Sequence, residues 1–124
     1  MRMWMLNITI MCKKHISGEH SEIHKHRKDF EREYSIKGRI EPQVLIQPKD
    51  MKNRHDKLAK ALNHKSVYTQ PDLQNYPTYQ KEAKVDKWKS LVELYRRCEN
   101  CRSIMQRKLS NKIIDKIEKE MLCS

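Results

Sequence analysis

Residues that turn or break a chain are scarce in this sequence of 124 residues, which contains two glycines and four prolines. A sheet that needs many tight turns is therefore not expected, whereas long helices are permitted. Aromatic residues make up 6% of the chain and apolar residues 37%, which is lean for a globular protein. No stretch approaches the roughly 20 consecutive apolar residues that cross a bilayer. We expect one domain, residues 1–124, with a modest core.

Cysteine is too sparse for a disulfide scaffold, because the cysteines lack the density and regular spacing found in small secreted domains. They are Cys12, Cys98, Cys101 and Cys123. The apolar start, residues 1–12, does not match a secretory signal, since Asn7 and Thr9 interrupt it and no small-residue cleavage site follows. We therefore expect a cytoplasmic protein.

Positive charge is what the chain has in abundance. Lysine and arginine number 27 against 16 aspartates and glutamates, which gives a formal net charge of +11 and a pI near 9.6. Such a surplus neutralises phosphates and releases condensed counterions, so the expected partner is double-stranded DNA. A basic surface without a partner and an anionic membrane surface are the alternatives. We expect a monomer that binds no membrane.

Apolar spacing predicts an all-α fold of three to four helices, with an extended N-terminal segment, residues 3–11, packed into the core. A first helix is expected over about residues 13–34, ended by Gly38 and Pro42. Its buried positions repeat every seven residues and continue one turn later. They are Ile16, Ile23, Phe30 and Tyr34.

Two further helices follow a short apolar connector at residues 43–47, which is either strand-like or a buried loop. One is expected just after Pro48, and its buried side consists of Met51, His55, Leu58 and Leu62. Another is expected over about residues 81–108, and its apolar side consists of Trp88, Leu91, Tyr95, Cys98 and Met105. The intervening residues 64–79 are predicted to form an ordered loop or a binding surface.

A fourth helix is predicted to begin with Ser110 as its N-cap. Its buried residues are expected to be Ile113, Ile114, Ile117 and Met121. Among the aromatic residues, Trp88 is expected to pack in the core. Tyr76 and Tyr79 are equally suited to the core and to stacking on bases.

Titratable side chains share one face of the predicted first helix, beside its apolar positions. At about 100° per residue, these are His15, Glu19, Glu22 and His26. A solvated face with local His–Glu pairs accounts for this spacing. His20 and His24, one turn apart, offer an alternative zinc pair that a neighbouring glutamate would complete.

Cys98 and Cys101 have the spacing that zinc sites and thiol redox sites use. A second pair of ligands is missing from this pattern, and Cys98 lies on the apolar side of its predicted helix. We therefore predict buried thiols, with no metal ligand and no cofactor. Zinc completed by histidines or by Cys12 is the alternative.

A family resemblance rests on two short runs near the start of the chain. They are Met1-Arg2-Met3-Trp4 and His15-Ile16-Ser17-Gly18-Glu19-His20-Ser21-Glu22-Ile23. In one ungapped register, these runs resemble the pyrimidine-dimer DNA glycosylase family of the bacteriophage endonuclease V type. The resemblance aligns Met1 with the family's catalytic N-terminal residue, Glu22 with its catalytic glutamate and Arg2 with its substrate-contacting arginine.

This resemblance implies a helical DNA repair glycosylase with abasic-site (AP) lyase activity, acting on pyrimidine dimers or abasic sites. In that family the terminal amine forms a Schiff base with C1′ of the damaged nucleotide's sugar, and β-elimination cuts the strand. An α-amino group with an ordinary pKa of about 7.7 to 8.0 is roughly one tenth free amine at neutral pH. Glu22 would stabilise the iminium and move the proton whose loss expels the 3′ phosphate. Because Arg2 is large, we expect Met1 to be retained.

The expected DNA contacts combine this register with the distribution of charge. They are Arg2, Lys14, His15, Ser21, Lys25, Arg54 and Lys65. Phosphate contacts of this kind offset the few kcal/mol that displacing a nucleotide costs. Lys25 occupies the position of a family arginine, whereas Ser21 stands where the best-known member has a phosphate-binding arginine and Met1 where it exposes a threonine.

Two other functions stay open. Met1 and Ser21 fit a DNA- or RNA-binding protein that keeps the scaffold without the chemistry. Cys98 and Cys101 fit a zinc-stabilised interaction module.

Overall fold

The computed structural model describes residues 2–123, with side chains described up to Leu122. These residues form six α-helices and no strand, which confirms the predicted all-α class. The helices are α1 (Lys13–Glu31), α2 (Met51–Ala61), α3 (Thr78–Lys81), α4 (Lys87–Arg97), α5 (Glu99–Lys108) and α6 (Asn111–Cys123). Short 3-10 turns are η1 (Ile8–Ile10), η2 (Lys37–Arg39) and η3 (Pro48–Asp50). None of the described helices combines the length and apolar character that crossing a membrane requires.

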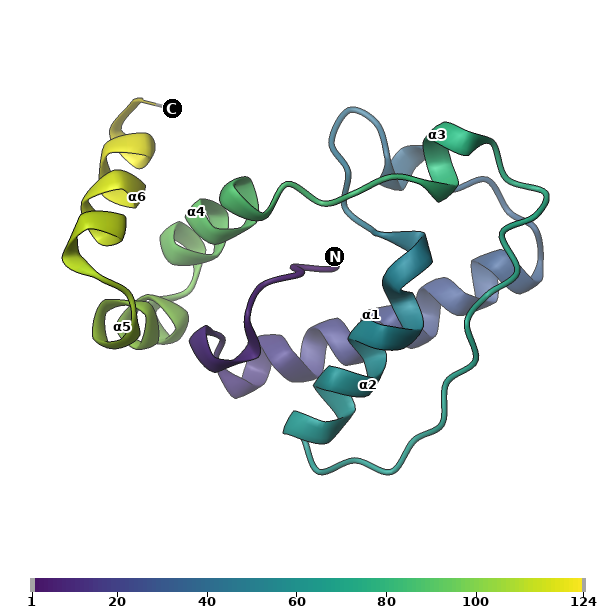
Figure 1. The fold of residues 1–124 in the computed structure, drawn as a ribbon, viewed down its shortest axis with the longest axis horizontal. Coiled ribbons are helices and arrows are strands. Elements are labelled where there is room, and N and C mark those ends of the chain that lie inside the picture. Colours follow the sequence, from purple (N-terminus) through teal and green to yellow (C-terminus); the bar gives the residue numbers. More distant parts are fainter. Residues whose placement is uncertain (1, 124) are drawn as a thin grey trace.

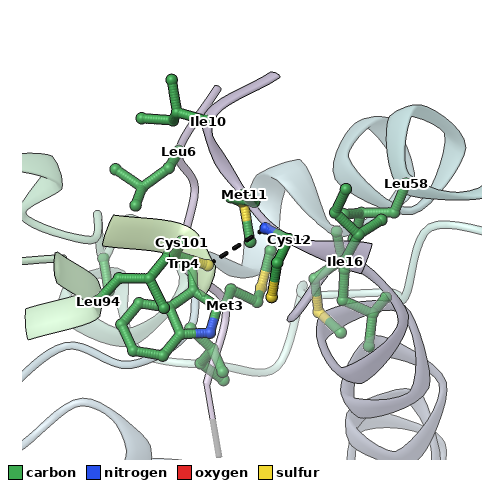
Figure 2. Packing of buried hydrophobic residues seen from close by; sticks show 14 of the residues in the cluster. Met3, Trp4, Leu6, Ile10, Met11, Cys12, Ile16, Leu58, Leu94 and Cys101 are labelled. Carbon is green, nitrogen blue, oxygen red and sulfur yellow. Dashed lines mark hydrogen bonds between the residues drawn. The ribbon is translucent and has the colours of Figure 1, made fainter. Parts of the chain in front are cut away.

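The longer helices gather in two groups that the N-terminal segment joins (Figure 1). α1 packs against α2, whereas α4 packs against α5 and α6. η1 lies between the groups and contacts both α5 and α2. The N-terminal segment packs into the core as predicted, and Met3 is fully buried there. Figure 2 shows Met3 and Trp4 beside Leu94 of α4 and Cys101 of α5.

α1 ends at Glu31, three residues earlier than the apolar spacing predicts. Glu33 adopts a left-handed conformation with φ 55°. This conformation lets the N–H of Tyr34 donate to the carbonyl of Asp29 at 2.8 Å, and that of Glu33 to Phe30 at 3.1 Å. The helix is therefore closed by its own backbone before Gly38. Tyr34 falls outside the helix and is 54% exposed, so its predicted burial is wrong.

The single helix predicted over residues 81–108 is wrong, because the structure divides it into α4 and α5 at Cys98. Arg102 of α5 stabilises the corner: its Nε donates to the carbonyl of Tyr95 at 2.9 Å and its Nη2 to that of Arg96 at 3.0 Å. Trp88, expected in the core, is 37% exposed on α4. The predicted core positions Ile16, Ile23, Phe30, Met51 and Leu58 are all buried.

α6 follows its predicted N-cap, because the Ser110 hydroxyl accepts from the N–H of Ile113 at 3.3 Å. Ile114 and Ile117 are buried as expected, whereas Ile113 is 36% exposed. The long connection after α2 is an ordered loop that passes along the α1–α2 group before α3 (Figure 1). Two tyrosines hold it there: the hydroxyl of Tyr68 donates to the carbonyl of Ile23 at 3.3 Å, and that of Tyr76 to Tyr34 at 2.8 Å.

Candidate functional site

A cavity of about 250 Å³ opens beside the N-terminal segment and the first half of α1. Its walls combine cations, two carboxylates, an imidazole and one indole ring. They are formed by Arg2, Trp4, Lys14, His15, Gly18, Glu19, Glu22 and Arg97. We call this cavity the N-terminal pocket. It brings together the predicted site residues Arg2, Lys14, His15 and Glu22, while Met1 lies outside the described residues.

Arg2 is held firmly in the wall of the N-terminal pocket. Its guanidinium donates to the hydroxyl of Ser90, which is fully buried on α4. The guanidinium carbon also lies 4.5 Å from the centroid of the Trp4 ring. Arg97 lies 5.6 Å from the centroid of the same ring. Burial and then the charge of Arg97 lower the pKa of Arg2. Sequence reasoning did not place Trp4, Ser90 and Arg97 together, because they converge only through the packing of α4 on the N-terminal segment.

The two glutamates of the pocket have different surroundings. Glu19 is 1% exposed and accepts two hydrogen bonds from Arg54, at 2.6 Å from Nε and 3.0 Å from Nη2. Glu22 is 8% exposed and has looser partners, with Lys25 Nζ 3.5 Å from Oε1 and His26 Nε2 3.8 Å from Oε2. The carboxylate of Glu22 is therefore the one available for chemistry with a ligand.

Arg54 lies in the interior, which differs from the surface position that a DNA contact needs. Its side chain is 6% exposed, and its Nη1 also donates to the carbonyl of Leu6 at 2.6 Å. These bonds fix the N-terminal segment and α1 to α2. The structure therefore assigns Arg54 a structural ion pair and gives no support to the predicted DNA contact.

The other predicted contacts are solvent-facing but dispersed. Lys14, Ser21 and Lys25 are exposed on α1, and Lys65 is exposed on the loop after α2. Of these, only Lys14 is a wall residue of the N-terminal pocket. A larger cavity of about 480 Å³ shares Arg2 and Arg97 with this pocket and is also lined by Trp88. The exposed indole is therefore placed beside cations rather than in the core.

Three imidazoles form a second group, which we call the histidine cluster: His20 and His24 of α1 and His55 of α2. The Nε2 atoms of His24 and His55 are 3.1 Å apart. The hydroxyl of Ser66 lies 3.1 Å from His20 Nε2 and 3.0 Å from His55 Nε2. Burial, followed by the neighbouring histidines, lowers the pKa of His20 to about 4. The cluster therefore contains a neutral His20 at neutral pH.

Three cysteines and one histidine form a third group, which we call the thiol cluster: Cys12, His15, Cys98 and Cys101. Their sulfur and nitrogen ligand atoms all lie within 4.8 Å of one another. The cysteines are free thiols. Burial raises the pKa of Cys101, and burial followed by Lys14 and Arg97 lowers that of His15.

This arrangement differs from the expected pair of buried thiols without further ligands. The second pair is Cys12-x-x-His15, which has the same spacing as Cys98-x-x-Cys101. Cys98 does not lie on the side of a continuous helix, because it occupies the corner between α4 and α5. The repeated spacing is the signal in the sequence that identifies the whole set.

Comparisons with protein-family models, curated proteins and solved structures found no match to this chain.

Proposed function

We propose that the protein binds damaged double-stranded DNA and cleaves it as a glycosylase with AP-lyase activity. The amino group of Met1 is the nucleophile, and Glu22 is the residue that moves protons. One observation carries the proposal: Glu22 and Arg2, the residue that follows Met1, line the same cationic cavity. The resemblance of residues 1–4 and 15–23 to the endonuclease V type of glycosylase supports the same roles.

The electrostatics of the N-terminal pocket suit this chemistry. Arg2, Lys14 and Arg97 supply positive charge that attracts a phosphodiester and orients it. Glu22 is nearly buried, so its carboxylate interacts more strongly with a cationic intermediate than a solvated one would. The pocket therefore attracts the DNA backbone while keeping one negative group for the iminium.

The reaction balances with groups of this chain and the substrate. The free amine of Met1 attacks C1′ of the sugar, and the damaged base leaves with a proton from the attacking nitrogen. The C1′–O4′ bond then breaks, O4′ takes a proton from solvent, and the nitrogen becomes an iminium. Glu22 then takes the proton from C2′, and the electron pair expels the 3′ phosphate. Hydrolysis of the imine releases the enzyme.

DNA binding without catalysis is the second candidate. The net charge of +11 supports binding whether or not the chemistry occurs. Under this alternative, the N-terminal pocket would hold a phosphate or a displaced base, and no strand would be cut.

The variant Glu22→Gln tests the role of the carboxylate. On a duplex with a single abasic site, we expect DNA affinity within about twofold of the parent and strand cleavage slower by about 10²- to 10⁴-fold. Glu31→Gln, on the exposed end of the same helix, is the matched control and should cleave normally. Full lyase activity in Glu22→Gln would remove this residue from the mechanism.

A further inference from the structure

The thiol cluster consists of two pairs with the same local geometry. Cys12 is the N-cap of α1 and His15 lies in its first turn; Cys98 is the N-cap of α5 and Cys101 lies in its first turn. A helix N-terminus favours negative charge, because its first N–H groups have no partner within the helix. The sulfurs of Cys12, Cys98 and Cys101 therefore lie at helix N-termini, whose partial positive charge favours a thiolate and opposes the burial that raises the pKa of Cys101.

The distances within the cluster fit a tetrahedral metal. With Zn–S near 2.3 Å and Zn–N near 2.0–2.1 Å, a tetrahedron has sulfurs about 3.8 Å apart and sulfur about 3.6 Å from nitrogen. The sulfurs of Cys12 and Cys98 are 3.8 Å apart. Nδ1 of His15 lies 3.2 Å from the sulfur of Cys12 and 3.7 Å from that of Cys101. These three separations are each within about 0.4 Å of the ideal edge, and all ligand atoms of the cluster lie within 4.8 Å of one another.

Backbone groups supply a second layer of support. The N–H of Cys12 donates to the sulfur of Cys101 at 3.2 Å (Figure 2), and the N–H of Cys101 donates to the sulfur of Cys98 at 3.4 Å. Hydrogen bonds of this kind orient thiolate ligands and stabilise their charge.

The break between α4 and α5 is a separate observation. Residues 87–108 contain neither glycine nor proline, and their apolar spacing favours one continuous helix. Cys98 nevertheless has extended angles, φ −119° and ψ 113°. The break turns the sulfur of Cys98 toward Cys12, which is 86 residues away in the sequence. A metal ion bound by both Cys98 and Cys12 would explain this corner, which the local sequence does not explain.

We propose that the thiol cluster binds one Zn²⁺ ion as a Cys₃His site. Zn²⁺ replaces the three thiol protons, which pass to solvent, and accepts a lone pair from Nδ1 of the neutral imidazole. No atom changes oxidation state. Three thiolates leave the site with a net charge of −1, which Lys14 and Arg97, the neighbours of His15 and Cys98 in the sequence, offset. This inference is independent of the proposed DNA chemistry.

The site joins the two helix groups at the wall of the N-terminal pocket. Zinc would tie the start of α1 to the α4–α5 corner. His15 also lines the pocket, and binding through Nδ1 leaves its Nε2 as the N–H donor. The ion therefore fixes both the position and the tautomer of a pocket residue without supplying a reactive open position, as expected of a structural zinc with four protein ligands.

The test uses the full chain without a polyhistidine tag, purified under reducing conditions. Elemental analysis should find one zinc per chain. Protein loaded with Co²⁺ instead should show thiolate-to-metal charge-transfer bands and the intense visible bands of tetrahedral cobalt. Chelation should lower the midpoint of thermal unfolding by roughly 10 °C or more, and added Zn²⁺ should restore it.

Matched variants locate the metal. Cys101→Ser should lose zinc and the charge-transfer bands, whereas Cys123→Ser and His24→Asn should keep both. The cobalt spectrum of the parent chain decides the question even if Cys101→Ser does not fold. Only trace metal in the reduced parent protein, with no thermal shift on adding Zn²⁺, would overturn the proposal. A Co²⁺-loaded parent protein whose spectrum lacks thiolate-to-metal charge-transfer bands would overturn it as well.

Discussion

The thiol cluster and the histidine cluster both gather potential metal ligands against α1, yet their surroundings differ. In the thiol cluster, the sulfurs of Cys98 and Cys101 accept hydrogen bonds from backbone N–H groups at two helix N-termini. In the histidine cluster, His20 and His55 both lie within hydrogen-bond distance of the Ser66 hydroxyl, and Nδ1 of His55 lies 3.0 Å from a carboxylate oxygen of Asp56. Tyr68 stacks on His55 at 4.8 Å. Short distances between ligand atoms therefore do not alone indicate a metal site, because partners that satisfy the ligands matter as much.

The Glu19–Arg54 ion pair neighbours residues of both clusters along the chain. Glu19 follows His15 by one turn and directly precedes His20, while Arg54 directly precedes His55. The pair joins α1 to α2, the two helices that supply the histidine cluster, and lies one turn from His15 of the thiol cluster. Variants of each cluster and of this ion pair measure how much each contributes to stability and to DNA binding.

The largest effect is expected from removing one ligand of the thiol cluster. Cys101→Ser should lower the free energy of unfolding by about 5 kcal/mol, because metal binding is linked to folding. His24→Asn, in the half-exposed part of the histidine cluster, should cost about 1 kcal/mol. Denaturation with guanidinium chloride measures both. Equal losses would erase the distinction between the clusters.

Breaking the Glu19–Arg54 ion pair should cause the next largest loss of stability. Arg54→Met leaves the buried carboxylate of Glu19 without its partner, so we expect a loss of about 3–5 kcal/mol. The double variant Glu19→Leu with Arg54→Met removes both charges and should recover most of that stability. Urea unfolding of the single and double variants tests this, and a double variant no better than the single would show that uncompensated charge is not the cause.

Acid should weaken the histidine cluster through protonation. The folded-state pKa of His20, about 4, lies below its ordinary value of 6.5, so the unfolded chain binds the proton more readily. The contribution of neutral His20 to the free energy of unfolding is therefore fully present above about pH 6.5 and is lost as the pH falls toward 4. With screening by solvent, His20 should account for about 1–2 kcal/mol. Zinc-stripped protein isolates this effect from metal release, and His20→Gln should have a flatter pH profile.

The smallest effect concerns the lysines beside each cluster. Lys14 adjoins the thiol cluster and the N-terminal pocket, while Lys65 adjoins Ser66 of the histidine cluster network. For each lysine that contacts a phosphate, replacement by alanine should reduce the slope of log affinity against log salt by about 0.9. Binding titrations at several salt concentrations test both variants, with Lys37→Ala as control. An unchanged slope for Lys14→Ala would contradict phosphate binding at the pocket.

The parts of the fold that depend on local spacing were predictable. Ile16, Ile23 and Phe30 are buried as expected because a seven-residue repeat alone places them on one side of a helix. Tyr34 was misplaced because Glu33 closes the helix in a left-handed conformation that usually favours glycine or asparagine. The helix break at Cys98 was not predictable, because no glycine or proline lies in this part of the sequence.

The candidate sites were predictable to different degrees. The resemblance groups Arg2, His15 and Glu22 because all three lie close to the start of the chain, and the structure places them around one cavity. Ser90 and Arg97 join them from α4 through tertiary packing, which no local pattern encodes. The thiol cluster was predictable only in part. The repeated spacing identifies the two pairs of ligands, but whether the pairs meet depends on the packing of α5 against η1.

Borohydride trapping is the most direct measurement of the central claim. The protein is mixed with duplex DNA containing an abasic site, or with ultraviolet-irradiated duplex, and the imine is reduced. We predict a covalent protein–DNA adduct that maps to Met1 and disappears when the amino terminus is extended or acetylated. DNA binding with no adduct and no strand cleavage would contradict the proposed chemistry, and an adduct that survives a blocked amino terminus would place the nucleophile on another residue.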